Sequence, residues 1–360
     1  MSLLFTPGTF GTLTLANRLV RSATAERMAD DEGRPRPELA RLYRDLARGG
    51  VGLIITGHMY VHPAGRCHLG MTGIYDDALI PGLAALVDAV HCEGGKIAVQ
   101  INHGGMQCAR ESVAGTIAPS AMDAPFLPQP AREMALNEIE GAIDAYAQAA
   151  RRAQIAGFDA VQIHGAHGYL INQFLSPFGN RRTDGWGGDL EGRMRFLRAV
   201  CAAVRAQVGP DYPLFIKFGM MDGIEGGLML HESLRVVAAM ADMGLDAIEL
   251  SGGITAGAIQ NSKAGVRNVE DEAYFRHFAK AARPVTSLPL MLVGGFRSRQ
   301  VMDDVLASGD VDFISLCRPL IAEPDLPNRL QQGQARSACI SGNRCWPKEA
   351  GEGIACRCLK

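Results

Sequence analysis

Eight short apolar runs recur along the chain, and amphipathic, alanine-rich stretches separate most of them. Almost every position in the runs is hydrophobic, as expected for strands buried on both faces of a sheet. The runs lie at residues 18–23, 51–57, 96–101, 160–165, 214–219, 247–251, 290–294 and 313–316. The amphipathic stretches with a helical period lie at residues 36–48, 80–92, 138–156, 190–208, 231–243 and 299–308.

This alternation of strands and helices predicts an α/β protein with a parallel sheet. Eight such units predict a single (β/α)8 TIM barrel. A β-hairpin is expected at residues 5–15, and a proline-rich insertion follows the third strand at residues 107–134. Because so long an insertion is unusual in a compact domain, we expect it to act as a lid or capping subdomain. The predicted organisation is a barrel over residues 1–335 and a cysteine-containing tail over residues 336–360.

Composition and charge narrow the class of protein. Of 360 residues, 47% are hydrophobic and 21% are charged, and the net charge of −2 predicts neither a nucleic-acid nor a membrane partner. Pro7 and Gly8 interrupt the first apolar run, so no signal peptide is expected. We therefore expect a cytoplasmic protein with reduced cysteines. No GxGxxG motif follows a predicted strand, which argues against a Rossmann dinucleotide site.

Polar side chains gather where the fourth run ends. His164 lies at the end of that run, and His167 and Tyr169 follow in a turn that precedes a helix. Barrel enzymes place their catalytic groups at the C-terminal ends of the strands. The sequence therefore predicts that these three side chains share an active site.

Alternation along the strands turns more polar side chains toward the barrel axis. Gln100, His164 and Lys217 each fall on the inner face near a C-terminal strand end. A lysine in an apolar strand is costly to bury without a partner. Structural interpretations stay open here: an ion pair of Lys217 with Asp222 or Glu225, and a core hydrogen bond for Gln100.

The last two strands end in residues suited to a phosphate. Gly294 and Gly295 close the seventh run, and Cys317 and Arg318 follow the eighth. In this fold the loops after these strands commonly hold a phosphate. Glycines let backbone N–H groups approach the anion, and an arginine adds a bidentate contact.

Several sequence blocks resemble the old yellow enzyme family of FMN-dependent oxidoreductases. The most specific block is HGAHGYLINQFLSP followed by NRRTDGWGGDLEGRMRF. Supporting blocks are NRLVRSATAE, VQINHGG, LVGGF and FISLCRPLIAEPDLPNR, so the resemblance runs from residue 5 to about residue 330. It implies FMN at the barrel mouth, NADH or NADPH as reductant, and a homo-oligomer, a dimer or a tetramer.

The resemblance also assigns roles to individual positions. The residues that it places around FMN are Ala23, Thr24, Gly57, Gln100, Lys217, Gly294, Gly295, Cys317 and Arg318. It makes His164 and His167 the ligands of a carbonyl or nitro oxygen, and Tyr169 the proton donor. The implied reaction is the reduction of an activated alkene by hydride from flavin N5.

Some positions depart from the family pattern. Ala25 stands where many members carry a threonine or cysteine facing the flavin. Met106 follows HGG where HxGR is usual, and Cys317 replaces a common glycine or serine. We expect the tuning of the flavin potential by residue 25 to be missing, whereas the chemistry itself should be retained.

Four cysteines gather in the tail, at Cys339, Cys345, Cys356 and Cys358. Larger relatives such as 2,4-dienoyl-CoA reductase and trimethylamine dehydrogenase bind a [4Fe–4S] cluster there through four thiolates, but Gly342 occupies the second ligand position. Cys356 as a substitute ligand, or zinc on three or four thiolates, stays open. The interpretation that we adopt is a tail without metal. Because the sequence stops at Lys360, we expect no further nucleotide-binding domains.

Three other functions remain at this stage. One is an iron–sulfur enzyme like 2,4-dienoyl-CoA reductase. The second is a metal-dependent barrel lyase or hydrolase that uses His164 and His167 as ligands, although few carboxylates other than Glu249 lie at strand ends. The third is a thiol or metal sensor built on the tail cysteines.

Overall fold

Eight parallel strands close into a barrel in the computed structural model, which describes residues 2–347 and 352–359. They are β3 (Leu19–Arg21), β4 (Leu53–Ile55), β6 (Ile97–Asn102), β9 (Ala160–Gly165), β10 (Leu214–Gly219), β11 (Ala247–Ser251), β12 (Leu290–Val293) and β13 (Phe313–Leu316). The first strand, β3, pairs with both β4 and β13, and β4 pairs with β6, so the ring has no free edge. The predicted (β/α)8 barrel is confirmed.

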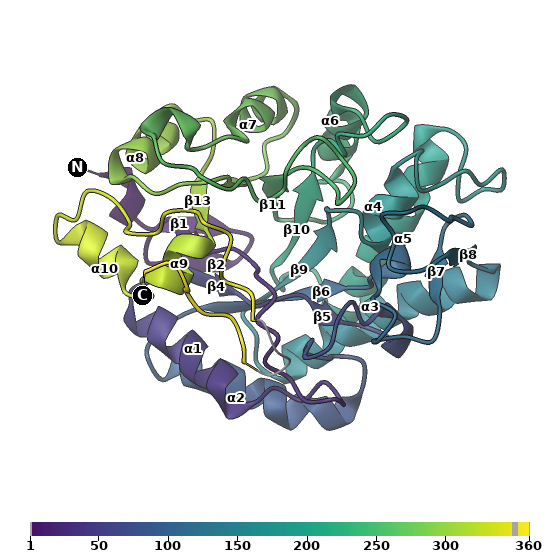
Figure 1. Cartoon of the computed structure of the whole chain (residues 1–360), viewed down its shortest axis with the longest axis horizontal. Helices are drawn as coiled ribbons and strands as arrows, with labels where there is room; N and C mark the ends of the chain where they lie inside the picture. The colour runs from purple at the N-terminus through teal and green to yellow at the C-terminus, as the bar shows by residue number, and fades with distance from the viewer. Residues whose placement is uncertain (1, 348–351, 360) are drawn as a thin grey trace.

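Helices surround the barrel (Figure 1). They are α1 (Pro37–Arg48), α2 (Ile80–His91), α3 (Leu136–Ile155), α5 (Leu190–Val208), α6 (Leu230–Ala239), α7 (Arg276–Ala282) and α8 (Arg299–Ala307). Six of the seven were predicted, although α6 ends at Ala239 and not at residue 243. The sequence pattern missed α7, because a helix of seven residues is too short to show a helical period.

The predicted hairpin closes the N-terminal end of the barrel. Its strands β1 (Gly8–Phe10) and β2 (Leu13–Leu15) are antiparallel. Phe10 packs inside the barrel against Phe215 and Phe313, with ring centroids 5.1 and 6.0 Å apart. This apolar layer fills the lower half of the barrel, so only the opposite end of the strands is left for a site.

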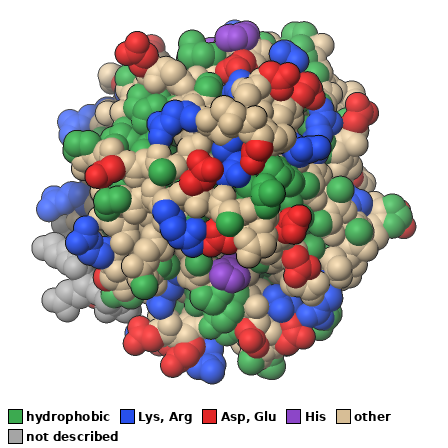
Figure 2. All heavy atoms as spheres, turned by 90° about the vertical axis from the view of Figure 1, so that its right-hand side faces the viewer, with side chains coloured by type: hydrophobic (Ala, Val, Ile, Leu, Met, Phe, Trp, Pro, Cys, Tyr) green, Lys and Arg blue, Asp and Glu red, His purple; other side chains and the backbone are tan. Residues whose placement is uncertain are grey.

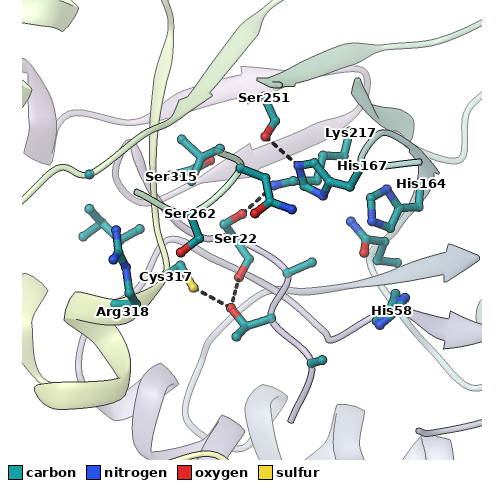
Figure 3. A pocket seen from close by; sticks show the side chains of 18 of the residues that line it. Ser22, His58, His164, His167, Lys217, Ser251, Ser262, Ser315, Cys317 and Arg318 are labelled. Carbon is teal, nitrogen blue, oxygen red and sulfur yellow. Dashed lines mark hydrogen bonds between the residues drawn. The ribbon is translucent and has the colours of Figure 1, made fainter. Parts of the chain in front are cut away.

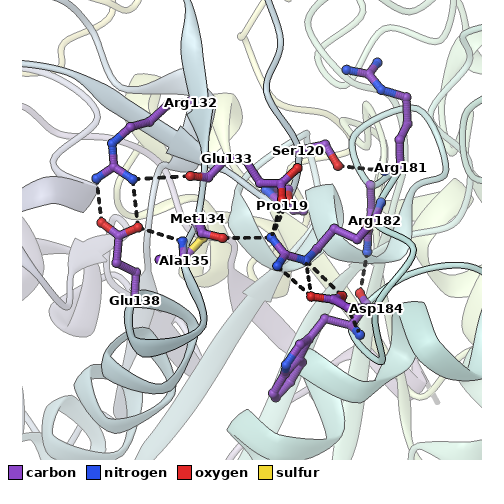
Figure 4. Close-up of polar contacts among 12 residues, drawn as sticks. Pro119, Ser120, Arg132, Glu133, Met134, Ala135, Glu138, Arg181, Arg182 and Asp184 are labelled. Carbon is purple, nitrogen blue, oxygen red and sulfur yellow. Dashed lines mark hydrogen bonds and ion pairs between the residues drawn. The ribbon is translucent and has the colours of Figure 1, made fainter.

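The insertion after β6 is folded and anchored. It contains the parallel pair β7 (Thr116–Ala118) and β8 (Ala131–Glu133). Arg182 donates hydrogen bonds to the carbonyl oxygens of Pro119 and Met134, at 2.9 and 2.8 Å, and also pairs with Asp184 (Figure 4). The short strand β5 (Met59–Tyr60) pairs with β6 beside it. The insertion is therefore fixed to the loop that follows β9 and α4 (Leu170–Leu175).

The tail returns to the C-terminal end of the barrel after two short helices, α9 (Arg318–Ala322) and α10 (Leu326–Gln331). The backbone N–H of Ile354 donates to the carbonyl of Glu26 at 3.0 Å, so the tail reaches the segment after β3. Residues 348–351 and 360 of the predicted tail lie outside the described residues.

The outer surface carries charges of both signs. On the face shown in Figure 2, acidic and basic side chains are interspersed, in keeping with the net charge of −2. Among the residues that the structure describes, no helix combines the length and apolar character needed to cross a bilayer.

Candidate active site

A cavity opens where the barrel strands end (Figure 3). Cys317 and Arg318 stand on one side of it, and His58 and His164 on the other. The predicted residues that line it are Ala23, Thr24, Gln100, His164, His167, Tyr169, Lys217, Gly295, Cys317 and Arg318. Ten of the twelve predicted residues thus lie around one cavity, and three of them, Gln100, His164 and Lys217, stand on barrel strands.

Two predicted glycines lie just outside the lining. A Cβ at Gly57 would stand 2.0 Å from Oε2 of Glu26, whose Oε1 accepts a hydrogen bond from the Gly57 N–H at 2.9 Å. This glycine therefore makes room for Glu26. Gly294 adjoins the cavity through Gly295, whose φ of +75° lies in the left-handed region that glycine adopts freely.

The cavity floor is a ladder of buried polar side chains. Gln100 donates to Gln162 at 2.7 Å, and Gln162 donates to Glu249 at 2.8 Å. Lys217 stands 3.1 Å from the same carboxylate and donates to Ser22 at 2.8 Å. The ladder fixes the positions of Gln100 and Lys217, which both line the cavity, as Ser22 does.

The ion pair that the sequence left open for Lys217 forms, but with another partner. Lys217 pairs with Glu249 and not with Asp222 or Glu225, because Lys217 and Glu249 stand side by side in the register of β10 and β11. Asp222 instead accepts hydrogen bonds from Asn172 and from the backbone of Leu228. Burial alone would raise the pKa of Glu249, but Lys217, Ser22 and Gln162 outweigh it and hold that pKa below its usual value.

His164, His167 and Tyr169 converge at one side of the cavity. The ring of His164 lies 5.3 Å from that of His167 and 4.8 Å from that of Tyr169, between centroids. The turn is shaped by His167, whose φ of +63° is unusual for a residue other than glycine. Ser251 at the end of β11 holds His167 Nε2 at 2.8 Å, whereas the buried Nδ1 of His164 has no partner in the described chain.

Both histidines are neutral at physiological pH. Burial, with the charge of Lys217, lowers the pKa of His167 to about 3. Burial, followed by His167, His58 and Lys217, holds the pKa of His164 well below its usual value. Burial also raises the pKa of Tyr169, so its phenol keeps its proton. The site therefore presents uncharged hydrogen-bond donors to a ligand.

The far end of the cavity suits an anion. Thr24 Oγ1 and Cys317 Sγ are 2.9 Å apart. Arg318 donates to the carbonyl of Lys263 at 2.8 Å and to Asn343 Oδ1 at 2.5 Å. The tail residue Asn343 thus helps to hold Arg318, a contact that the sequence did not reveal because it joins segments brought together only by the fold.

These residues fit an FMN molecule. Arg318 and the backbone at Gly295 suit its phosphate. Gln100 donates through its amide to Gln162, which leaves its carbonyl oxygen without a partner among the described residues and able to accept from a ring N–H. Lys217 supplies positive charge beside it. The buried hydroxyl of Ser315, which has no partner among the described residues, also lines the cavity.

Three tail cysteines, Cys339, Cys345 and Cys356, interact electrostatically near this end. Cys339 and Cys345 are buried, and Cys356 and Cys358 are partly exposed. Burial, together with neighbouring thiols that include Cys317, raises the pKa of Cys345 to about 12. Within residues 2–347 and 352–359, no three His, Cys, Asp or Glu side chains are arranged to hold a metal ion.

Among the lining residues that sequence reasoning missed are Arg27, His58, His68 and Trp346. His58 lies just after β4, and this position beyond the end of a strand could have indicated it as a site residue. The other three stand in loops or in the tail, where no strand period indicates which way a side chain points.

Comparisons with known proteins identify the family. Residues 3–337 match the NADH:flavin oxidoreductase / NADH oxidase family. The chain is 35% identical to NADH oxidase of Thermoanaerobacter brockii, covering 94% of this chain but 52% of that protein, so it spans about half that relative's length. It is also 35% identical to NADPH dehydrogenase of Geobacillus sp. (strain WCH70), covering 96% of this chain and 99% of that one.

A solved structure agrees with the sequence match. The old yellow enzyme homologue from Zymomonas mobilis superposes with a TM-score of 0.81 at 28% identity, over 97% of this chain and 98% of that one. Family members use FMN together with NADH or NADPH, and the cavity fits that flavin. The chain therefore belongs to the NADH:flavin oxidoreductase family of the old yellow enzymes.

Proposed function

We propose that the protein is an NAD(P)H-dependent ene-reductase, which reduces the activated C=C bond of an α,β-unsaturated carbonyl or nitro compound. The observation that carries the proposal is the convergence of two neutral histidines and a protonated tyrosine on one side of the cavity. This arrangement suits an oxygen that gains negative charge beside a carbon that needs a proton.

The two histidines would bind that oxygen. With Nε2 of His167 held by Ser251, its Nδ1 is the atom left for a ligand. The buried Nδ1 of His164 has no other partner in the described part of the chain. In the tautomers that carry the proton on Nδ1, both rings donate to the oxygen and stabilise its developing charge.

Tyr169 would supply the proton. Its ring stands against His164 at 4.8 Å, close to where the substrate oxygen would lie. Because burial raises its pKa, the phenol stays protonated over the working pH range and can donate to a basic carbon. When bound, FMN supplies the hydride chemistry, and the protein supplies orientation and electrostatics.

Lys217 would favour negative charge on the ring side of the cavity. Its ammonium group is fixed by Glu249 and Ser22 and lines the floor beside Gln100. A preorganised charge of this kind needs no rearrangement during the reaction. The cavity floor carries no feature that favours NADH over NADPH. We also propose that the protein is a cytoplasmic homo-oligomer.

The test is the binding of a phenol, because a phenolate imitates the substrate oxygen. In the FMN-loaded protein, 4-hydroxybenzaldehyde should produce a long-wavelength charge-transfer band. His164→Ala and His167→Ala should each weaken this binding and slow enone reduction, with about a hundredfold loss of rate for one lost donor. The double variant should lose less than the sum, because both groups bind one oxygen.

His277→Ala is the matched control, because His277 packs on Phe278 of α7 and does not line this cavity. It should leave the band and the affinity as they are. Absence of the band in the unaltered protein, with the same phenol affinity in both histidine variants, would contradict the shared oxygen site.

A further inference from the structure

One cation of the cavity lining has no partner in the part of the chain that the structure describes. Arg27 lines the mouth and is partly buried, and among the described residues it makes no hydrogen bond or ion pair. Its Nε atom is fully buried without an acceptor. The other two cations of the lining differ, because Lys217 pairs with Glu249 and Arg318 binds Lys263 and Asn343.

The backbone takes an unusual conformation at Arg27. Arg27 has a φ of +57°, in the left-handed region that costs a long side chain about 1 kcal/mol or more. Its neighbour Glu26 is not available as a counter-ion. That carboxylate pairs with Arg21 at 2.7 Å and accepts from Tyr43 at 2.8 Å.

The side chains that line the cavity around Arg27 add no negative charge, and outside the lining the exposed Glu111 acts on His68. The Arg27 guanidinium acts electrostatically on His58, His68 and Tyr169, and it contributes to the lowered pKa values of both histidines. No aspartate or glutamate is among the described residues that line the cavity. A buried guanidinium donor without an acceptor is unfavourable, and a bound anion would relieve it.

We propose that Arg27 binds an anionic oxygen group, a carboxylate or a phosphate, of the ligand that His164 and His167 hold. This inference rests on the proposed function and deepens it, because it selects acidic alkenes, or the phosphates of the dinucleotide, over neutral ligands. The planar guanidinium can donate two parallel hydrogen bonds to such a group. His68 and Tyr169 stand beside it in the same mouth.

The test compares two phenols that differ in one charge: 4-hydroxybenzoate and its methyl ester. Each is titrated against the FMN-loaded full chain through the flavin spectrum, and the ratio of their dissociation constants is taken. In the unaltered protein the carboxylate should bind about tenfold tighter than the ester. The ratio should fall to about one in Arg27→Met and take an intermediate value in Arg27→Lys.

Arg34→Met is the matched control. It removes the same charge from the same segment, but its side chain is 57% exposed and pairs with Glu32 at the surface. The ratio should stay at its original value there. Because both phenols are measured on each variant, a general loss of fold or of flavin cancels from the ratio.

A second arm separates the two sources of the anion. NADPH and the phosphate-free 1-benzyl-1,4-dihydronicotinamide are compared as ligands of the same variants. If Arg27→Met loses the preference for NADPH and keeps the phenol ratio, the anion that Arg27 binds is a phosphate of the dinucleotide. If only the phenol ratio changes, the anion that Arg27 binds is a carboxylate of the acceptor.

Unchanged ratios in both arms, or an equal change in Arg34→Met, would overturn the role of Arg27 while the proposed function stands. If neither phenol perturbs the flavin of the unaltered protein, it is the oxygen site of His164 and His167 that fails.

Discussion

The floor of the cavity and its mouth satisfy their polar groups differently. On the floor, each member of the ladder from Gln100 to Lys217 has a partner within the protein. At the mouth, Nδ1 of His164 and Nε of Arg27 are buried and unpartnered in the described chain. A paired group holds its position without a ligand, whereas an unpaired donor gains a bond when a ligand arrives. The floor groups are therefore held in place before the flavin binds, whereas the mouth groups are left to bind the substrate.

The largest expected effect comes from breaking the floor. Lys217→Met leaves Glu249 as a buried charge without its partner, so the free energy of unfolding should fall by about 3–5 kcal/mol. Urea unfolding of the apoprotein measures it. Lys96→Met is the control, because the side chain of Lys96 is 43% exposed and pairs with Asp159. The loss of this exposed ion pair should lower the free energy of unfolding by about 1 kcal/mol or less. Equal losses in the two variants would mean that the ladder is not a tightly coupled unit.

Acid should weaken the fold through the histidines of the cavity. The pKa of His68 is lowered to about 4 and that of His167 to about 3, mainly by burial. The unfolded chain takes up protons near pH 6.5 and the folded chain does not, so stability falls as pH drops below about 6.5. Each such histidine contributes a slope of about 1.4 kcal/mol per pH unit between about pH 6 and pH 5.

His167→Asn measures the contribution of one histidine to the dependence of stability on pH. Unfolding free energies of the apoprotein across this window should show a slope smaller by about 1.4 kcal/mol per pH unit than in the unaltered chain. His91→Asn is the control, since His91 is 37% exposed beside Asp159. A slope unaffected by His167→Asn would show that this ring takes up its proton in the folded state as readily as in the unfolded chain.

The smallest expected effect concerns the tail at the phosphate end. Asn343→Ala removes one acceptor from Arg318, which keeps its bond to the carbonyl of Lys263. FMN affinity should fall about fivefold, the share of one hydrogen bond of about 1 kcal/mol. Quenching of flavin fluorescence measures it, with Gln300→Ala on the outer face of α8 as the control. An unchanged FMN affinity would show that the contact of Asn343 with Arg318 does not contribute to flavin binding.

The strand-borne part of this site could be predicted from the sequence. The bounds of β9, β10, β11 and β13 agree with those of the predicted strands. The alternation of side chains placed Gln100 on β6, His164 on β9 and Lys217 on β10 toward the cavity. Period-2 patterns report orientation directly, because successive strand residues point to opposite faces.

The remainder depended on contacts between distant segments. Pairing Lys217 with Glu249 requires the register of β10 against β11, which a single strand does not encode. Arg27, Asn343 and Trp346 stand in loops or in the tail, and their places follow from packing across the barrel mouth. No local period reports such packing.

Tyr169→Phe tests the assignment of the proton donor, and with it the ene-reductase reaction, most directly. Stopped-flow traces follow flavin reduction by NADH or NADPH, then reoxidation by an enone or by oxygen, beside the control Tyr75→Phe, whose hydroxyl binds the carbonyl of Glu32 at the surface. We predict that reduction and oxygen reoxidation persist in Tyr169→Phe, while enone reoxidation slows by about a hundredfold or more. Enone reoxidation at the full rate, or equal slowing of every step, would contradict the role of Tyr169 as proton donor.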